Sequence, residues 1–94
     1  MYIEFEYDQN KSLSNKQKHG IDFKKAQELF VGDVAVIGAK NVDTEARFAA
    51  IGKIDTKFYT IIYTYRDKAI RIISARRSRK NEEKLYEEYF SKRV

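Results

Sequence analysis

The sequence predicts an α+β fold in which two N-terminal helices and a C-terminal helix pack on an antiparallel β-sheet. Three β-rich runs, residues 47–54, 58–65 and 69–76, are separated by short polar breaks only. Such spacing indicates a meander, because parallel strands need long crossovers. Helical patterns stand before and after these runs. The chain of 94 residues is expected to form one domain, residues 1–94, with one core and no large internal cavity.

The N-terminal segment predicts a strand followed by a polar helix. Apolar and charged residues alternate in MYIEFEY, residues 1–7, which is typical of a strand with one buried face. Asp8 is a candidate N-cap for a helix over residues 9–18, and Gly20 a candidate C-terminal cap. Leu13 is the only apolar side chain of this helix. We expect the helix to be weakly anchored, since helices are held mainly by an apolar stripe.

A second helix is expected to begin at Asp22 and to end at Gly32. The side chains at helical spacing are Phe23, Ala26, Gln27, Leu29 and Phe30. A short apolar run at residues 34–38 then predicts a strand, and residues 39–46 predict a polar connection to the meander.

The C-terminal part predicts a well-covered central strand and a closing helix. Both faces of the run at residues 58–65 are apolar enough to be covered. Ser78 is a candidate cap for the last helix, with Glu82 and Glu83 in its first turn. Its apolar stripe, which should lie on the sheet, consists of Leu85, Tyr86, Tyr89 and Phe90.

Composition narrows the classes of partner. The formal net charge is +5, and seven Tyr and six Phe make 7 + 6 = 13 aromatic residues, a balance that favours a polyanionic partner or, equally, simple solubility. Cysteine is absent, which excludes disulfides and thiolate zinc sites. The N-terminus lacks the apolar run of a signal peptide or a membrane span. We therefore expect a cytoplasmic protein.

A cluster of cationic residues begins within the last β-rich run and continues just beyond it. No acidic residue interrupts the set Arg71, Arg76, Arg77, Arg79 and Lys80. Guanidinium groups bind phosphate oxygens in a bidentate manner, and clustered cations repel one another unless an anion visits. The sequence favours a phosphate-binding cluster over a merely solvated strand end.

Two further pairs are candidates for chemistry. Glu45 and Arg47 would point to one face of a strand, although such a pair is usually a surface ion pair. Lys18 lies beside His19, the only histidine, and a lone histidine is more often structural than catalytic. With no second imidazole and no thiolate, a zinc site is not expected, nor is any cofactor.

Together these residues fit RNA cleavage on an open surface. The reaction requires a deprotonated 2′-hydroxyl, stabilised charge on the phosphorane and a protonated leaving 5′-oxygen. Glu, His, Lys and Arg side chains supply these functions, and Tyr59, Tyr63 or Tyr65 can stack a splayed base. We expect the two-helix corner and the arginine-bearing strand end to meet on one side of the molecule.

Over nearly its whole length the chain resembles the BrnT family of ribonuclease toxins, whose fold is similar to that of RelE-like toxins. Three blocks carry the resemblance. They are FEYD at residues 5–8 with Lys11, Asn15 and KHGIDF at 18–23; EARF at 45–48 with Ile51-Gly52; and RIISAR at 71–76 with Glu82 and Tyr86.

The resemblance implies a type II toxin that cleaves mRNA, inhibits translation and is neutralised by a small antitoxin of the BrnA type. That antitoxin would bind operator DNA through a ribbon-helix-helix part. The matching candidates for the active surface are Lys18, His19, Glu45, Arg47, Arg71 and Arg76. Glu45 is our candidate base, Lys18 or His19 the proton donor or charge stabiliser, and the arginines phosphate clamps. Candidate RNA-binding residues are Arg77, Arg79, Lys80, Tyr63 and Tyr65.

Three positions depart from the family pattern. Tyr7 stands where Trp is common and Phe48 where Trp or Phe occurs, and both keep an aromatic ring. Ala46 replaces an acidic residue often found beside Glu45, and neighbours on a strand face opposite ways, so Glu45 could not simply substitute. A non-catalytic nucleic-acid- or protein-binding module of the same fold is therefore the alternative. A purely structural protein that docks on an acidic chain is a third interpretation.

Overall fold

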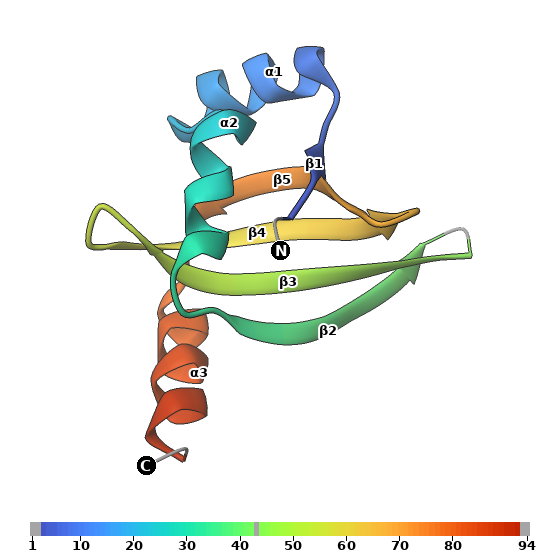
Figure 1. The fold of residues 1–94 in the computed structure, drawn as a ribbon. Coiled ribbons are helices and arrows are strands. Elements are labelled where there is room, and N and C mark those ends of the chain that lie inside the picture. The colour runs from blue at the N-terminus through green and yellow to red at the C-terminus, as the bar shows by residue number, and fades with distance from the viewer. Residues whose placement is uncertain (1–2, 43, 93–94) are drawn as a thin grey trace.

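The structure is a computed structural model that describes residues 3–42 and 44–92 (Figure 1). The elements in chain order are β1 (Phe5–Glu6), α1 (Gln9–His19), α2 (Phe23–Ala26), the 3₁₀ helix η1 (Gln27–Val31), β2 (Ala35–Val42), β3 (Glu45–Ile54), β4 (Lys57–Arg66), β5 (Ala69–Arg77) and α3 (Lys80–Ser91). The predicted α+β class is confirmed. The second predicted helix is shorter than expected, because the chain tightens into η1 after Ala26.

The five strands form one sheet in the order β1-β5-β4-β3-β2. The predicted antiparallel meander of β3, β4 and β5 is confirmed. The sheet as a whole is mixed, because β1 pairs with β5 in parallel. The long chain between these two strands makes such a pairing possible, since no short turn has to join them. Residues 1 and 2 of the predicted first strand lie outside the described part, and the observed strand is only Phe5–Glu6.

The prediction of a polar connection over residues 39–46 is wrong for most of that segment. β2 continues to Val42, and β3 already begins at Glu45. Asn41 pairs with Ala46 and Val42 with Glu45, after an irregularity in the register near Gly38. Cross-strand pairing therefore overrides the polar composition of this segment.

The main core lies between one face of the sheet and α2 with η1, which cross in front of the sheet in Figure 1. Phe23, Ala26 and Leu29 are fully covered there. Gly52 on β3 permits this close packing: a Cβ at that position would stand 3.0 Å from Leu29 Cγ and 3.1 Å from the Asp33 carbonyl oxygen.

The anchoring of α1 differs from the prediction. Leu13 is 55% exposed, whereas Ser12 and Asn15 are buried. Ser12 Oγ accepts a hydrogen bond from the Phe23 backbone nitrogen at 2.9 Å. Asn15 Nδ2 donates to the Ala75 carbonyl at 2.8 Å, and Asn15 Oδ1 accepts from the Ala75 nitrogen at 3.2 Å. A polar face therefore holds α1 firmly against the edge of β5 that β1 leaves open.

Asn15 also fixes the corner between the first two helices. Its Nδ2 donates a second hydrogen bond, to the Ile21 carbonyl, at 2.8 Å. Gly20 takes the left-handed conformation, φ 77°, and its nitrogen donates to the Lys16 carbonyl, as expected for the C-terminal cap. The predicted caps Asp8 and Asp22 are confirmed, each accepting from the backbone nitrogen three residues later.

Ser78 does not cap the last helix. Its hydroxyl lies 2.8 Å from Thr60 Oγ1 and its nitrogen donates to the Phe58 carbonyl, so Ser78 still belongs to the sheet. The N-cap of α3 is Arg79, whose nitrogen donates to Glu82 Oε1 at 2.8 Å. The helix contacts β2 and β3, as predicted for a helix on the sheet, and extends away from the sheet in Figure 1.

Replacement of Asn15 is expected to be strongly destabilising. Asn15→Ala leaves the Ala75 nitrogen and two carbonyl oxygens without partners, and should lower the free energy of unfolding by about 3 kcal/mol. Asn15→Asp sets a carboxylate oxygen against the Ile21 and Ala75 carbonyls and should cost at least as much at neutral pH. Urea unfolding measures both.

The matched control is Asn10→Ala, at an exposed position of the same helix. It should change the free energy of unfolding by no more than about 0.5 kcal/mol. Equal effects at positions 10 and 15 would contradict the anchoring described for Asn15.

Candidate active site

The second face of the sheet is hollowed at the end remote from α3. A hollow of about 140 Å³ lies there. Its lining residues are Asp8, Lys11, Glu45, Arg47, Thr64, Arg66, Arg71, Ile72 and Ile73. Four of these side chains are cationic and two are acidic, so the hollow carries an excess of positive charge. Three of the six residues predicted as catalytic, Glu45, Arg47 and Arg71, are thus brought together.

The strands position these side chains through register and a bulge. Thr64 pairs with Arg71 and Thr60 with Arg76, so both arginines share the second face with the two threonines. Simple alternation would put residues 71 and 76 on opposite faces. The register of β5 shifts so that Ile62 pairs with Ser74 but Tyr63 with Ile72. The extra residue, Ile73, forms a β-bulge that restores a common face.

A chain of loose ion pairs connects the charged groups of the hollow. Arg71 Nη1 lies 3.2 Å from Glu6 Oε1, and Arg66 Nε lies 4.0 Å from the same oxygen. Arg66 Nη2 is 3.5 Å from Glu45 Oε1, and Arg47 Nε is 3.6 Å from Glu45 Oε2. These groups are partly exposed and their contacts are long, so each pair contributes little to stability. An arriving phosphate can therefore replace the carboxylates as the partner of the arginines.

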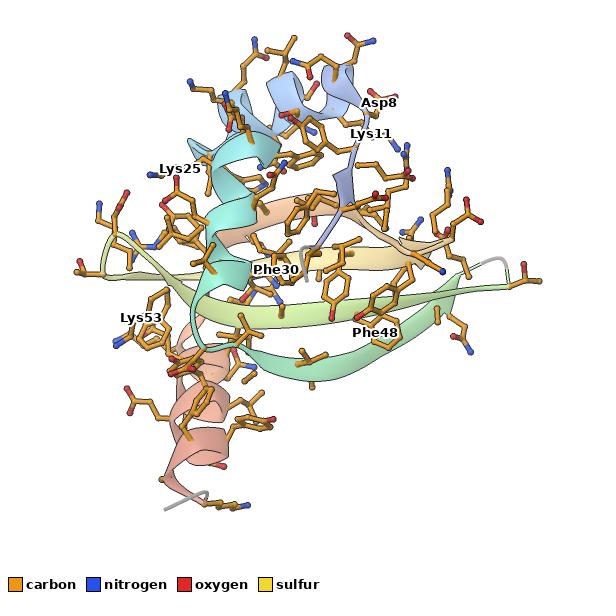
Figure 2. The ribbon with its side chains drawn as sticks, in the orientation of Figure 1. Asp8, Lys11, Lys25, Phe30, Phe48 and Lys53 are labelled. Carbon is orange, nitrogen blue, oxygen red and sulfur yellow. The ribbon has the colours of Figure 1, made fainter. Side chains whose placement is uncertain are left out.

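Lys18 and His19 line a neighbouring hollow of about 230 Å³ between α1 and β5. Lys11 and Ile73 line both hollows, so the two adjoin along β5. Figure 2 shows Lys11 beside Asp8 at the start of α1. The two-helix corner therefore lies against β5 as predicted, but Lys18 and His19 do not line the hollow that contains Arg71.

Arg76 is held elsewhere, by α3. Its Nη1 and Nη2 donate to Glu82 Oε1 and Oε2, both at 2.8 Å, and the two side chains are 23% and 12% exposed. Glu82 also accepts from Thr60 Oγ1 at 3.1 Å. The Arg76 guanidinium, together with the Arg79 nitrogen and Thr60, lowers the pKa of Glu82 to about 2 against the opposing effect of burial. This bidentate pair joins α3 to the sheet, and Arg76 lines neither hollow.

The remaining predicted cations also lie around the start of α3. Arg77 Nε donates to the Phe58 carbonyl at 3.2 Å, and its guanidinium lies 5.6 Å from the centre of the Tyr59 ring. Arg79 caps the helix and Lys80 is its first residue. These side chains line neither of the two hollows beside α1.

Two of the three tyrosines proposed for base stacking, Tyr63 and Tyr65, differ in exposure. Tyr63 is 2% exposed, with Phe30, Phe48 and Tyr65 packed around its ring. Burial raises the pKa of Tyr63 well above its usual range. Its ring offers no face to a base. Tyr65 is 57% exposed and lines a hollow with Ala46 and Phe48 next to the charged one, so it can stack a base.

Comparison with known proteins assigns the family. Residues 7–82 match the family model described as "Ribonuclease toxin, BrnT, of type II toxin-antitoxin system". The chain belongs to the BrnT family. A search of curated proteins found no match. The protein is thus an endoribonuclease toxin of the type II class, with RNA as its substrate and an antitoxin as its partner.

The BrnT match covers both hollows and the Arg76–Glu82 pair. Within residues 3–42 and 44–92, no three His, Cys, Asp or Glu side chains are grouped so that they could hold a metal ion. In the same part of the chain, no helix has the length and apolar character needed to cross a membrane.

Among the polar residues of this candidate site, Lys11, Thr64 and Arg66, together with Glu6 beside the arginines, were not predicted as site residues from the sequence. Lys11 was noted only as a family position. One signal could have identified it, because residues 11, 14, 15 and 18 follow the i, i+3, i+4, i+7 spacing of one helix face. The positions of Glu6 and Arg66 depend on the pairing of β1 with β5 and on a turn. No local sequence pattern predicts either feature.

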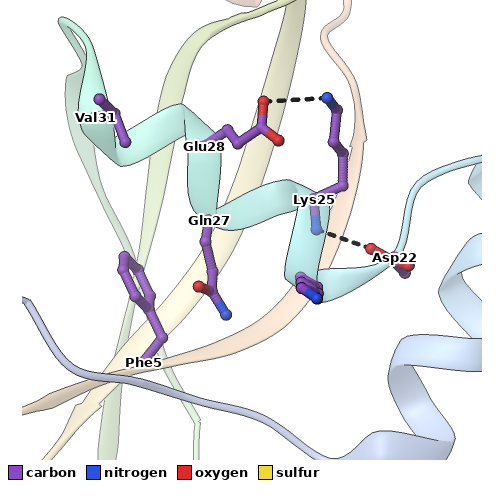
Figure 3. A pocket seen from close by; sticks show the side chains of 7 residues that line it. Phe5, Asp22, Lys25, Gln27, Glu28 and Val31 are labelled. Atoms are coloured by element: carbon purple, nitrogen blue, oxygen red, sulfur yellow. Dashed lines mark hydrogen bonds and ion pairs between the residues drawn. The ribbon is translucent and has the colours of Figure 1, made fainter.

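A further hollow, on the side of α2 and η1, is chemically different. It measures about 510 Å³ and lies along α2 and η1, with Phe5 and Val31 at one end and Lys25 at the other (Figure 3). Lys25 Nζ is paired with Glu28 at 3.1 Å and with Asp55 at 3.0 Å, contacts that raise its pKa. Its two lysines, Lys24 and Lys25, are matched by two carboxylates, Asp22 and Glu28, so it lacks the excess of positive charge found in the hollow at Arg71.

The Arg76–Glu82 pair predicts a specific pH dependence of stability. Because the pKa of Glu82 is lowered in the folded state, the pair stabilises the fold fully above the ordinary pKa of 4.5 and loses its effect as the pH falls towards about 2. Glu82→Gln should lower the free energy of unfolding by about 2 kcal/mol at pH 7. The difference from wild type should shrink between pH 4.5 and 2, as followed by urea unfolding.

Glu87→Gln, at an exposed position of the same helix, is the control and should differ little from wild type across this pH range. A Glu82→Gln deficit that stays constant with pH would show that charge pairing with Arg76 is not its cause.

Proposed function

We propose that this BrnT-family toxin cleaves mRNA by attack of the 2′-hydroxyl on the adjacent phosphate, without a metal ion, and thereby inhibits translation. The observation that carries the proposal is the hollow in which Glu45 stands among Arg47, Arg66, Arg71 and Lys11. Four cationic side chains can meet the charge of a phosphorane, which is the task a metal would otherwise perform.

Each step of the cleavage can be given to a side chain of this hollow. Glu45 removes the proton from the 2′-hydroxyl, and the 2′-oxygen bonds to phosphorus. Arg47 and Arg71 hold the phosphate oxygens while charge builds up on the phosphorane. The bond from phosphorus to the 5′-oxygen then breaks, leaving a 2′,3′-cyclic phosphate and a 5′-hydroxyl. Tyr65, exposed beside the hollow, stacks a neighbouring base.

The leaving 5′-oxygen needs a proton donor. Our sequence analysis gave this role to Lys18 or His19, but both line the neighbouring hollow. Lys11 lines both hollows and makes no ion pair within the described residues. We therefore assign the donation of the proton, or the stabilisation of the alkoxide, to Lys11, close to the arginines.

The partner that we propose is a BrnA-like antitoxin with a ribbon-helix-helix part, through which the complex would bind operator DNA. The family of type II toxins supports an antitoxin partner. A net charge of +5 supports attraction to an acidic segment of that antitoxin as well as to RNA.

Cleavage of a structured mRNA by the purified protein tests the enzyme. We expect cuts that carry 2′,3′-cyclic phosphate ends and persist in EDTA, and none at nucleotides whose 2′-hydroxyl is methylated. Glu45→Gln and Arg71→Ala should each lower the cleavage rate by roughly 10²-fold or more. Glu45→Gln should keep RNA binding, because it removes no cation.

Lys84→Ala, an exposed lysine on α3 outside both hollows, is the matched control and should cleave as wild type does. Circular dichroism checks that each variant is folded. Tight RNA binding by wild type without any cut would favour the binding module over the enzyme.

The antitoxin proposal is tested by co-expression with the small reading frame adjacent to the toxin gene. We expect restored growth and a complex that binds operator DNA, whereas the toxin alone does not retard that DNA in a gel. A neighbouring product that binds the toxin but lacks a ribbon-helix-helix part would contradict a BrnA-like identity.

A further inference from the structure

The hollow at the end of α1 has the chemistry of a phosphate site. Its lining residues are Lys11, Ser14, Asn15, Lys18, His19, Ile73 and Ser74. None of them is acidic, and Lys11, Lys18 and His19 make no ion pair within the described part of the chain. The ammonium groups of Lys11 and Lys18 repel one another in this hollow, and an anion bound between them would relieve the repulsion.

The fold of α1 brings these cations to one side. Lys11, Ser14, Asn15 and Lys18 follow the i, i+3, i+4, i+7 spacing of a single helix face. Asn15 fixes the rotation of that face through its two hydrogen bonds to Ala75. The helix dipole favours cations in the last turn, which accounts for Lys18 and His19 but not for Lys11 in the first turn.

Two features connect this hollow to the catalytic one. Lys11 and the bulged residue Ile73 line both. Lys11 and Lys18 are separated by two helical turns, a rise of about 10 Å, so successive phosphates of one strand can reach the two hollows. A flexible single strand follows such a bend more readily than a duplex.

We propose that Lys18, His19 and the hydroxyls of Ser14 and Ser74 form a subsite for the phosphate that flanks the cleaved one on single-stranded RNA. The subsite rests on the proposed ribonuclease function, and it assigns Lys18 and His19 to substrate binding instead of to proton transfer. The Lys18 ammonium balances the phosphate charge, and the imidazole N–H of His19 and the hydroxyls donate hydrogen bonds to its oxygens.

Substrates that differ by one phosphate test the subsite. A dinucleotide has only the cleaved linkage, whereas trinucleotides extended on the 5′ or the 3′ side add a flanking one. For wild type, one of the two trinucleotides should have a kcat/KM about tenfold higher than that of the dinucleotide, mainly because its KM is lower. This size is expected for a charged hydrogen-bonded contact. The same trinucleotide with a neutral methylphosphonate at the flanking linkage should lose this gain.

In the double variant Lys18→Gln/His19→Gln the gain should fall below about twofold. Lys16→Gln, an exposed lysine of the same helix that lines neither hollow, should keep the full gain. A double variant that retains the gain would overturn the subsite. A double variant with kcat reduced equally on both substrates would also overturn it, because Lys18 and His19 would then take part in the chemical step.

Binding of an uncleavable 2′-O-methyl RNA separates this proposal from the proposed function. The slope of log affinity against log salt should become shallower by about 0.7 in the double variant, the value for one lost phosphate contact on a single strand. Lys16→Gln should keep the wild-type slope. If wild type does not cleave RNA but its slope is steeper than that of the double variant, the proposed function is contradicted and the phosphate subsite is supported. An unchanged slope overturns the subsite even if cleavage is found.

Discussion

The hydrogen bonds of Asn15 are the constraint on which the site depends. Its side chain donates to the Ile21 and Ala75 carbonyls and accepts from the Ala75 nitrogen. These bonds satisfy the backbone groups at the open edge of β5 and at the helix corner, and they also satisfy the buried amide of Asn15 itself. A strand edge needs a donor and an acceptor side by side, which a carboxamide supplies and a purely apolar contact cannot. Because the bonds are directional, they fix both the rotation and the position of α1 along β5. The cationic face of α1 therefore lies beside the hollow of Arg71 instead of pointing freely into solvent.

The second determinant is the bulge at Ile73. It places Arg71 and Arg76 on one face of the sheet, yet the two arginines have different surroundings. Glu82 binds Arg76 through both oxygens at 2.8 Å, and further donors satisfy that carboxylate. Glu6 makes a single contact of 3.2 Å with Arg71. A guanidinium that donates two short hydrogen bonds to one carboxylate holds two elements of the fold together, whereas a loosely paired guanidinium remains available to an anion. The geometry of the carboxylate, more than the position of the arginine on the strand, decides which role each one takes.

The sequence predicted the elements of this fold better than their contacts. Apolar spacing located the meander and the last helix, and caps located the corner at Gly20, because these signals are local. The parallel pairing of β1, the extension of β2 to Val42 and the bulge depend on partners distant in sequence. Glu45, Arg47 and Arg71, which the family resemblance grouped, line one hollow, whereas Arg76, grouped with them by the same resemblance and by the cation cluster, is bound to Glu82. Tyr63 was misjudged as accessible because a strand buried on both faces leaves no alternation to read.

The polar character of α1 follows from the same physics. A helix anchored by an apolar stripe would have to turn that stripe onto the core, and its cations would then point away from the sheet. Ser12 and Asn15 anchor α1 with little apolar area, so the helix can lie at the edge of the sheet, beyond β5 in Figure 1. From this position its charged residues border the second face, where Arg47 of β3 and Arg71 of β5 are partly exposed. Polar anchoring thus lets a small protein border its charged hollow with cations that make no ion pair within the described residues, without burying them. The polar residues of α1 thus supply both the buried hydrogen bonds that anchor the helix and the cations at the surface.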